Sequence, residues 1–283
     1  MATVACAAAA PVVYVGIPPQ RWLVQQLASN RVQIGLLLAP GQNPHTFEPT
    51  ARQVRDLAAA QVYLLMGLPF ERALVTKVQA INPRLRVYDL GAGIPRRISS
   101  VHRELGASEH NHDACAEGSD PHVWLTPAAM GCMASNAVAA LVVLDPEGEG
   151  IYAARLSRLR ERLARLDTDL RAMLTPVLGG VMLTYHASWG YLTDAYGLRM
   201  VSIESEGRAP AARQLAAMID LAREAKVRRI FTEPPYDPKP CQTLARQIGA
   251  EVVTIDPLAE CWDTNLRAIA QQVRAALRPD DSP

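Results

Sequence analysis

Short runs of β-branched and aliphatic residues alternate with amphipathic stretches along the first half of this chain. The runs predict strands over residues 11–17, 32–38, 62–67 and 85–90. Helix patterns lie between them, over residues 18–27, 50–60 and 70–80. A run such as 32–38 is typical of a parallel strand that is covered on both faces. This half is therefore predicted to be an α/β unit with a mainly parallel sheet.

The same alternation returns in the second half of the chain. Strands are predicted over 181–185, 198–203, 228–232 and 252–255, with helices over 210–225, 238–248 and 262–277. One long helical pattern precedes this half, with Leu156, Leu159, Leu163 and Leu166 on an apolar face. We expect an N-terminal α/β lobe over 11–145, a long connecting helix over 146–175, and a C-terminal α/β lobe over 176–283, each lobe with about four strands flanked by helices.

The composition fits a protein with a sizeable core. The chain has 283 residues, of which 49% are hydrophobic and 20% charged. The formal net charge of +1 gives no reason to expect nucleic acid or an anionic membrane as a partner. No apolar run is predicted to be long enough to span a bilayer.

The N-terminus and the cysteines leave alternatives open. Residues 1–10 are Ala-rich, too short for a signal peptide and without its charged region, which suggests a signal peptide that was removed or truncated. Lipid anchoring through Cys6 lacks the usual preceding Leu. Five Cys without a Cys-x-x-Cys pair argue against a zinc ribbon. Cys132 is interpreted as a buried small hydrophobe, and a disulfide between Cys241 and Cys261 stays open.

Side chains that bind metals stand at or after the ends of predicted strands. His186 and Asp256 directly follow two strands of the second half, while His45 and His122 lie in loops after strands of the first half. Ligands of open α/β sheets bind beyond the carboxyl ends of the strands, so we expect these four residues to meet in a cleft between the halves. Three imidazoles and a carboxylate make a filled tetrahedral shell for zinc.

Other candidates compete for the same role. Glu233 also ends a predicted strand, and is either the carboxylate ligand or a partner that orients a His. Glu204 and Glu206 follow another strand. His110 and His112 lie in a long polar loop, where they form a possible low-affinity metal site. No Gly-x-Ser-x-Gly, Walker A or His-Glu-x-x-His motif is present, so we predict a metal-capturing protein and no enzyme.

Five ordered motifs, which together cover nearly the whole chain, resemble those of metal-specific solute-binding proteins of ABC importers, the ZnuA/TroA-like family (cluster A-I). They are Asn43–Thr50, Asp120–Leu125, Tyr185–Tyr191, Phe231–Pro234 and Ile255–Leu258. The resemblance implies two α/β lobes bridged by one long rigid helix, with the metal bound between the lobes.

The same resemblance implies a function. Members with His at the position of His186 resemble zinc carriers, and those with Glu resemble manganese or iron carriers. The chain would then be a monomeric periplasmic protein that captures Zn²⁺ and delivers it to an ABC permease and its ATPase. The alternatives are a carrier of Mn²⁺ or Fe²⁺, a metal-binding adhesin and, more remotely, a zinc hydrolase in which Asp256 acts as a general base.

Overall fold

The computed structural model describes residues 10–97, 119–204 and 212–278, and within them the chain divides into two compact units. Both units are discontinuous in sequence. Unit 1 comprises Met1–Ala39, Pro44–Ala92 and Gly131–Glu161, and unit 2 comprises Pro40–Asn43, Gly93–Met130 and Arg162–Pro283. Each unit holds one four-stranded sheet. The lobe boundaries expected from the sequence stay a prediction.

The sheet of unit 1 contains β1 (Val12–Val15), β2 (Gln33–Leu36), β3 (Val62–Leu65) and β4 (Arg86–Asp89) in the order β2-β1-β3-β4. All three pairings are parallel. Tyr14 on β1 lies opposite Gly35 on β2, and its ring occupies the space that a side chain at position 35 would need. A glycine is therefore required here by close packing.

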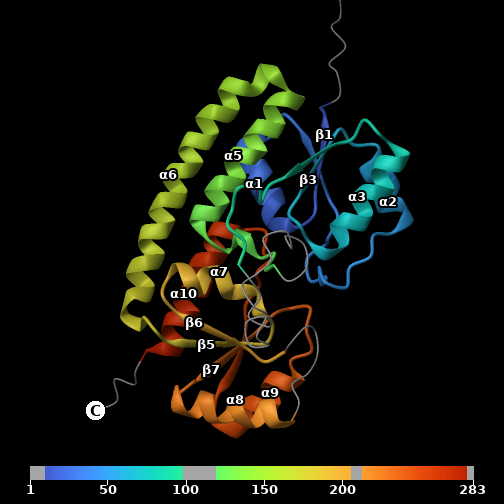
Figure 1. Cartoon of the computed structure of the whole chain (residues 1–283). Helices are drawn as coiled ribbons and strands as arrows, with labels where there is room; N and C mark the ends of the chain where they lie inside the picture. Colours follow the sequence, from blue (N-terminus) through green and yellow to red (C-terminus); the bar gives the residue numbers. More distant parts are fainter. Residues whose placement is uncertain (1–9, 98–118, 205–211, 279–283) are drawn as a thin grey trace, which may run out of the picture. The chain divides into compact units, whose positions relative to one another are not determined.

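Helices cover both faces of this sheet, with α2 and α3 on one face and α1 on the other (Figure 1). They run over Pro18–Ala28 (α1), Ala51–Ala58 (α2) and Pro69–Ile81 (α3). Proline stands in the first turn of α1 and α3, where no backbone donor is lost. Thr50 caps α2, because its side-chain oxygen accepts a hydrogen bond from the backbone of Gln53.

The sheet of unit 2 repeats this topology. It contains β5 (Val181–Thr184), β6 (Arg199–Ser202), β7 (Arg229–Thr232) and β8 (Glu251–Thr254) in the order β6-β5-β7-β8, again with parallel pairing throughout. From β5 the chain passes to β6 on one side and later to β7 on the other, so the strand order changes direction between β5 and β7. Such a switch point is where open α/β sheets hold their ligands.

Helices also cover both faces of the second sheet, with α8 and α9 on one face and α7 and α10 on the other (Figure 1). They run over Gly190–Ala195 (α7), Ala212–Glu224 (α8), Lys239–Ile248 (α9) and Trp262–Leu277 (α10). Two 3₁₀ turns, η1 (Val123–Leu125) and η4 (Ala187–Trp189), precede helices. A core cluster that includes Leu183, Ile230 and Leu244 fills the space between sheet and helices.

Two helices belong to both units. The first, α5 (Pro127–Leu144), begins in unit 2 and continues into unit 1, and α6 (Glu149–Leu174) begins in unit 1 and ends in unit 2. The predicted fold class, α/β with two four-stranded parallel sheets and one long helix, is confirmed. Within this fold β2 lies at a sheet edge, where Gln33 is exposed and the other residues of the strand are half-buried.

The helix α5 also corrects an expectation. It is long and apolar enough to cross a membrane by length and composition alone, although no such run was expected from the sequence. Several of its side chains, including Met130, Met133 and Ala137, are completely buried. Burial of this kind is typical of a core helix, so length and composition are weak evidence for a membrane span here.

The described cysteines are free thiols. Cys132 is exposed, so its interpretation as a buried residue is wrong. Cys241 lies in the core of unit 2, where burial raises the pKa of its thiol to about 11, and it forms no disulfide with the exposed Cys261. Cys6 and Cys115 lie outside the described residues.

Candidate metal centre

His186 lies two residues after the end of β5, at the switch point of the second sheet. Its Nδ1 donates a hydrogen bond to Oε1 of Glu204, which follows the neighbouring strand β6. The backbone of Glu204 in turn donates to the carbonyl of Tyr185, at 3.0 Å, and so continues the pairing of the two strands. With Nδ1 engaged by Glu204, Nε2 is the nitrogen of His186 that would bind a metal.

His122 stands at the start of the turn η1, where it is 5% exposed. One carboxylate oxygen of Asp120 accepts two hydrogen bonds from it, from the backbone nitrogen at 2.9 Å and from Nδ1 at 2.8 Å. Burial alone would raise the pKa of Asp120, but the hydrogen bonds from His122 lower it below its usual range. Asp120 therefore stays ionised and, as the acceptor of both bonds, fixes the orientation of the His122 ring.

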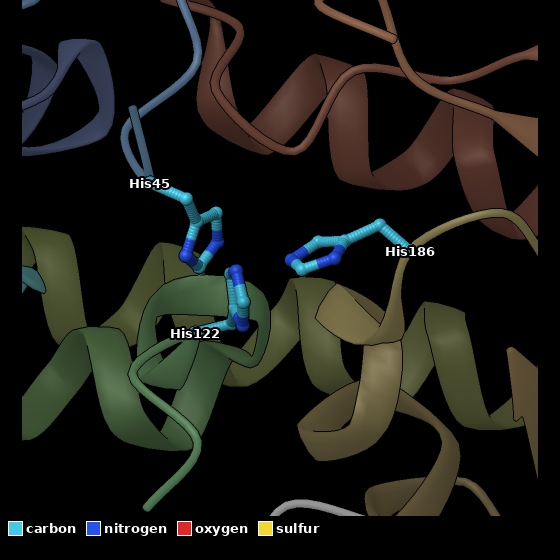
Figure 2. A group of neighbouring side chains, drawn as sticks. All are labelled: His45, His122 and His186. Carbon is cyan, nitrogen blue, oxygen red and sulfur yellow. The ribbon is translucent and has the colours of Figure 1, made fainter. Parts of the chain in front are cut away.

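These two imidazoles lie side by side in unit 2 (Figure 2). The ring centroids of His122 and His186 are 5.2 Å apart with the planes at 74°, and a ring nitrogen of each lies within 4.8 Å of one of the other. Two imidazoles, each hydrogen-bonded to a carboxylate, are an arrangement found around bound transition metals.

His45 comes from unit 1, in the loop that follows β2, and its side chain is exposed (Figure 2). The loop is fixed on the C-terminal side of this residue. Phe47 is buried and packs edge-on against Phe70 at 5.0 Å between ring centroids, and the capping box of Thr50 and Gln53 follows. The fold of unit 1 thus presents His45 from a short, anchored segment.

Asp256 and Glu233 follow β8 and β7, and their carboxylates differ in how they are held. Oδ1 of Asp256 accepts from the backbone of Leu258 at 2.8 Å, and the side chain is only partly buried. Oε1 of Glu233 accepts from Oγ of Ser188 and from Nε1 of Trp189, and the residue is 4% exposed. Burial raises the pKa of Glu233 to about 8 and also raises that of Asp256.

A network of tryptophans ties the Asp256 loop to the His122 turn. Nε1 of Trp124 donates to the carbonyl of Pro257 at 2.8 Å, and Nε1 of Trp262 donates to the carbonyl of Trp124 at 2.8 Å. All three residues are buried. The backbone around Asp256 is therefore held relative to His122 by buried hydrogen bonds, which are costly to break.

The electrostatics of this part of unit 2 suit a divalent cation. Burial lowers the pKa of His186 below its usual value, so the ring stays neutral and able to ligate over a wider pH range. The nearby charges of Glu204 and Asp120 oppose this effect only in part. Oε2 of Glu204 is buried and has no hydrogen-bond partner among the described residues, which leaves an unsatisfied acceptor on the carboxyl group that holds His186.

The sequence did not predict which carboxylates serve the two histidines. Asp120 belongs to one of the five motifs, but the sequence alone gives it no role. The signal that could have revealed this role is a carboxylate two residues before a His, with a proline between them. Glu204 was one of several strand-end acids. The candidates His110, His112 and Glu206 lie outside the described residues.

Comparison with known proteins identifies relatives along most of the chain. A family model described as the periplasmic component A of a zinc-uptake complex, ZnuA, matches residues 13–275. The high-affinity zinc uptake system protein ZnuA of Paracoccus denitrificans is 29% identical over 260 residues, which are 81% of this chain and 78% of that protein. A crystal structure of a ZnuA deletion mutant with zinc bound superimposes with a TM-score of 0.86 at 31% identity, over 96% of this chain and 99% of that one.

Some relatives are much longer than this chain. The zinc-binding protein AdcA of Streptococcus pyogenes serotype M3 is 24% identical over 253 residues, which cover 86% of this chain. The match spans about half of that relative, 49% of its length.

Proposed function

Because this chain belongs to the ZnuA family of periplasmic zinc-uptake components, we propose that it is a periplasmic protein that captures Zn²⁺ with high affinity between two lobes and delivers it to an ABC transporter. The observation that carries the proposal is the pair formed by His122 and His186, in which each Nδ1 is bonded to a carboxylate. In this arrangement the two Nε2 atoms would be the ligands to one ion.

The ligand set of the proposal is His45, His122, His186 and Asp256. The first of these comes from unit 1 and the other three from unit 2. Asp256 is preferred to Glu233 because Asp256 is less buried and engages one oxygen with a single backbone donor, whereas Glu233 is held by Ser188 and Trp189. Glu233 would support the site from behind.

A shell of three imidazoles and one carboxylate bears on both the cargo and the chemistry. It satisfies the tetrahedral preference of zinc, and nitrogen-rich sites favour zinc over manganese. It also leaves no open position for an activated water, so the protein is proposed to be a carrier without hydrolase activity.

The partners follow from the same proposal. A permease and its ATPase would receive the ion from a monomeric carrier. The lobes would extend over 11–145 and 176–283, with the helix 146–175 between them. Localisation in the periplasm agrees with the family to which the chain belongs.

A titration of metal-free protein tests the proposal. We expect one zinc ion per chain, bound more tightly than manganese in competition with a chromogenic chelator, because imidazole ligands rank zinc above manganese. The proposal is wrong if zinc does not bind or if manganese displaces zinc at equal concentration.

Replacing Glu204 tests how the site orients its ligands. Glu204→Ala is expected to weaken zinc binding by about 10- to 100-fold, because Nδ1 of His186 loses the carboxylate that fixes its ring and tautomer. Glu204→Gln is the matched control, since it keeps an oxygen acceptor for Nδ1 and should lose less affinity. Equal affinity in a folded Glu204→Ala protein would contradict this role.

A further inference from the structure

Arg97 makes contacts that connect several parts of unit 2. Its Nη1 donates to Oδ2 of Asp120 at 2.9 Å, and its Nε and Nη2 donate to the two oxygens of Asp194 on α7 at 2.6 and 3.2 Å. Its backbone nitrogen donates to the hydroxyl of Tyr191 at 3.0 Å, and its carbonyl accepts from the backbone of Asp120 at 2.8 Å. The side chain is only 18% exposed.

The guanidinium is closely enclosed. Its central carbon lies 5.7 Å from the centroid of the Tyr191 ring, within reach of a cation–π interaction. It also lies against Gly190, the first residue of α7, where a Cβ would come within 1.4 Å of Nη1. A side chain at position 190 would collide with Arg97. Glycine is therefore required at this position for the guanidinium to keep its place.

Arg97 acts on one oxygen of Asp120 and His122 on the other. The carboxylate of Asp120 is 4% exposed, and its Oδ1 holds both the backbone and Nδ1 of His122. A buried carboxylate with a charged donor on its second oxygen has one favoured rotamer and little freedom to turn. The orientation of the His122 ring therefore depends on Arg97 through Asp120.

We propose that Arg97 is a positioning residue for the metal site, which fixes the ring orientation and tautomer of His122 through Asp120 and ties both to the helix that follows His186. This inference rests on the proposed function for its effect on zinc affinity. The effect on His122 itself is a property of the metal-free protein.

Two measurements on Arg97→Ala test the role. Zinc affinity, from chelator competition, is expected to fall by about 10- to 100-fold, as for loss of other outer partners of metal ligands. In the metal-free protein, ¹⁵N NMR of the imidazole nitrogens should show one tautomer of His122 in the original protein, protonated on Nδ1, and a mixture in the variant. Arg97→Lys should restore affinity only in part, because an ammonium cannot bridge two carboxylates as a guanidinium does.

The controls separate this role from general destabilisation. Arg267→Ala removes another arginine–aspartate pair of unit 2, which Arg267 forms with Asp169 at 2.7 Å. This pair does not contact a histidine. The substitution should therefore change zinc affinity less than about twofold. Gly190→Ala keeps Arg97 in the chain but displaces its guanidinium, and is the deciding variant if Arg97→Ala does not fold.

The outcomes that overturn the proposal are distinct from failure of the proposed function. Suppose that folded Arg97→Ala or folded Gly190→Ala binds zinc with the affinity of the original protein and shows a single tautomer of His122. This result would show that Arg97 does not position His122. If the original protein binds no zinc, the proposed function fails, while the tautomer measurement still decides whether Arg97 acts on His122.

Discussion

Replacing His122 by alanine is expected to weaken zinc binding by more than the roughly 10- to 100-fold loss that removal of an outer partner causes. The imidazole supplies one of four proposed ligands, and no other described His of unit 2 apart from His186 lies beside it. The substitution also leaves Oδ1 of Asp120 with one hydrogen bond fewer in a buried position, so water would have to replace the ring. His186→Ala should have a comparable effect.

Affinity measured by competition with a chelator, on protein first stripped of metal, decides this prediction. The thermal transition of each metal-free variant shows whether it is folded. His102, which lies outside the described residues, is not in the proposed ligand set. His102→Ala is therefore the control for loss of a histidine, and it should bind zinc as the original protein does. A folded His122→Ala protein with unchanged affinity would remove His122 from the ligand set.

Acidification is expected to release the metal steeply. Ligand histidines bind zinc only when they are neutral, so between about pH 7.5 and about pH 5 each protonated imidazole costs affinity, and several together give a slope above one proton per ion. Burial lowers the pKa of His186 below the usual value, so this ligand should stay neutral to lower pH than an exposed histidine with a pKa of about 6.5.

The same shift predicts how the metal-free protein responds to pH. A His186 with a lowered pKa binds its proton less readily in the folded chain than in the unfolded chain. The unfolded state therefore holds more protons below about pH 6.5, and the free energy of unfolding falls as the pH drops through that range. Zinc affinity and thermal unfolding measured at matched pH values separate release from denaturation. An affinity that is flat from neutral to acidic pH would contradict the imidazole ligand set.

The fold was predictable from local patterns because the hydrophobic pattern of each helix and strand agrees with the structure that the segment adopts. The helix α10 runs from Trp262 to Leu277, as its apolar period predicted, and α2 lies within the predicted range 50–60. Exposure was harder to predict. The edge position of β2 and the exposure of Cys132 depend on which elements become neighbours, and a local pattern does not contain that information.

The site was predictable at the level of single ligands and not at the level of their partners. His122 and His186 lie in motifs that are visible in the sequence, and the structure places these two rings together. Whether the predicted set of four binds one ion stays a prediction. Glu204 serves His186 because β6 pairs with β5, and Arg97 reaches Asp120 and Asp194 across long sequence separations. Neither contact has a signature in the residues alone.

The discontinuous composition of the two units has a consequence for how the protein is made. All four strands of the first sheet have been synthesised by Asp89, but unit 1 also includes Gly131–Glu161 and lacks that part until α6 emerges. Unit 2 begins with segments that precede α5 and needs β8 and α10 at the other end of the chain. Neither unit corresponds to a single stretch that folds behind the ribosome as a sequential domain would. A chain that must wait in this way leaves the apolar strands of both sheets without part of their cover until late in synthesis.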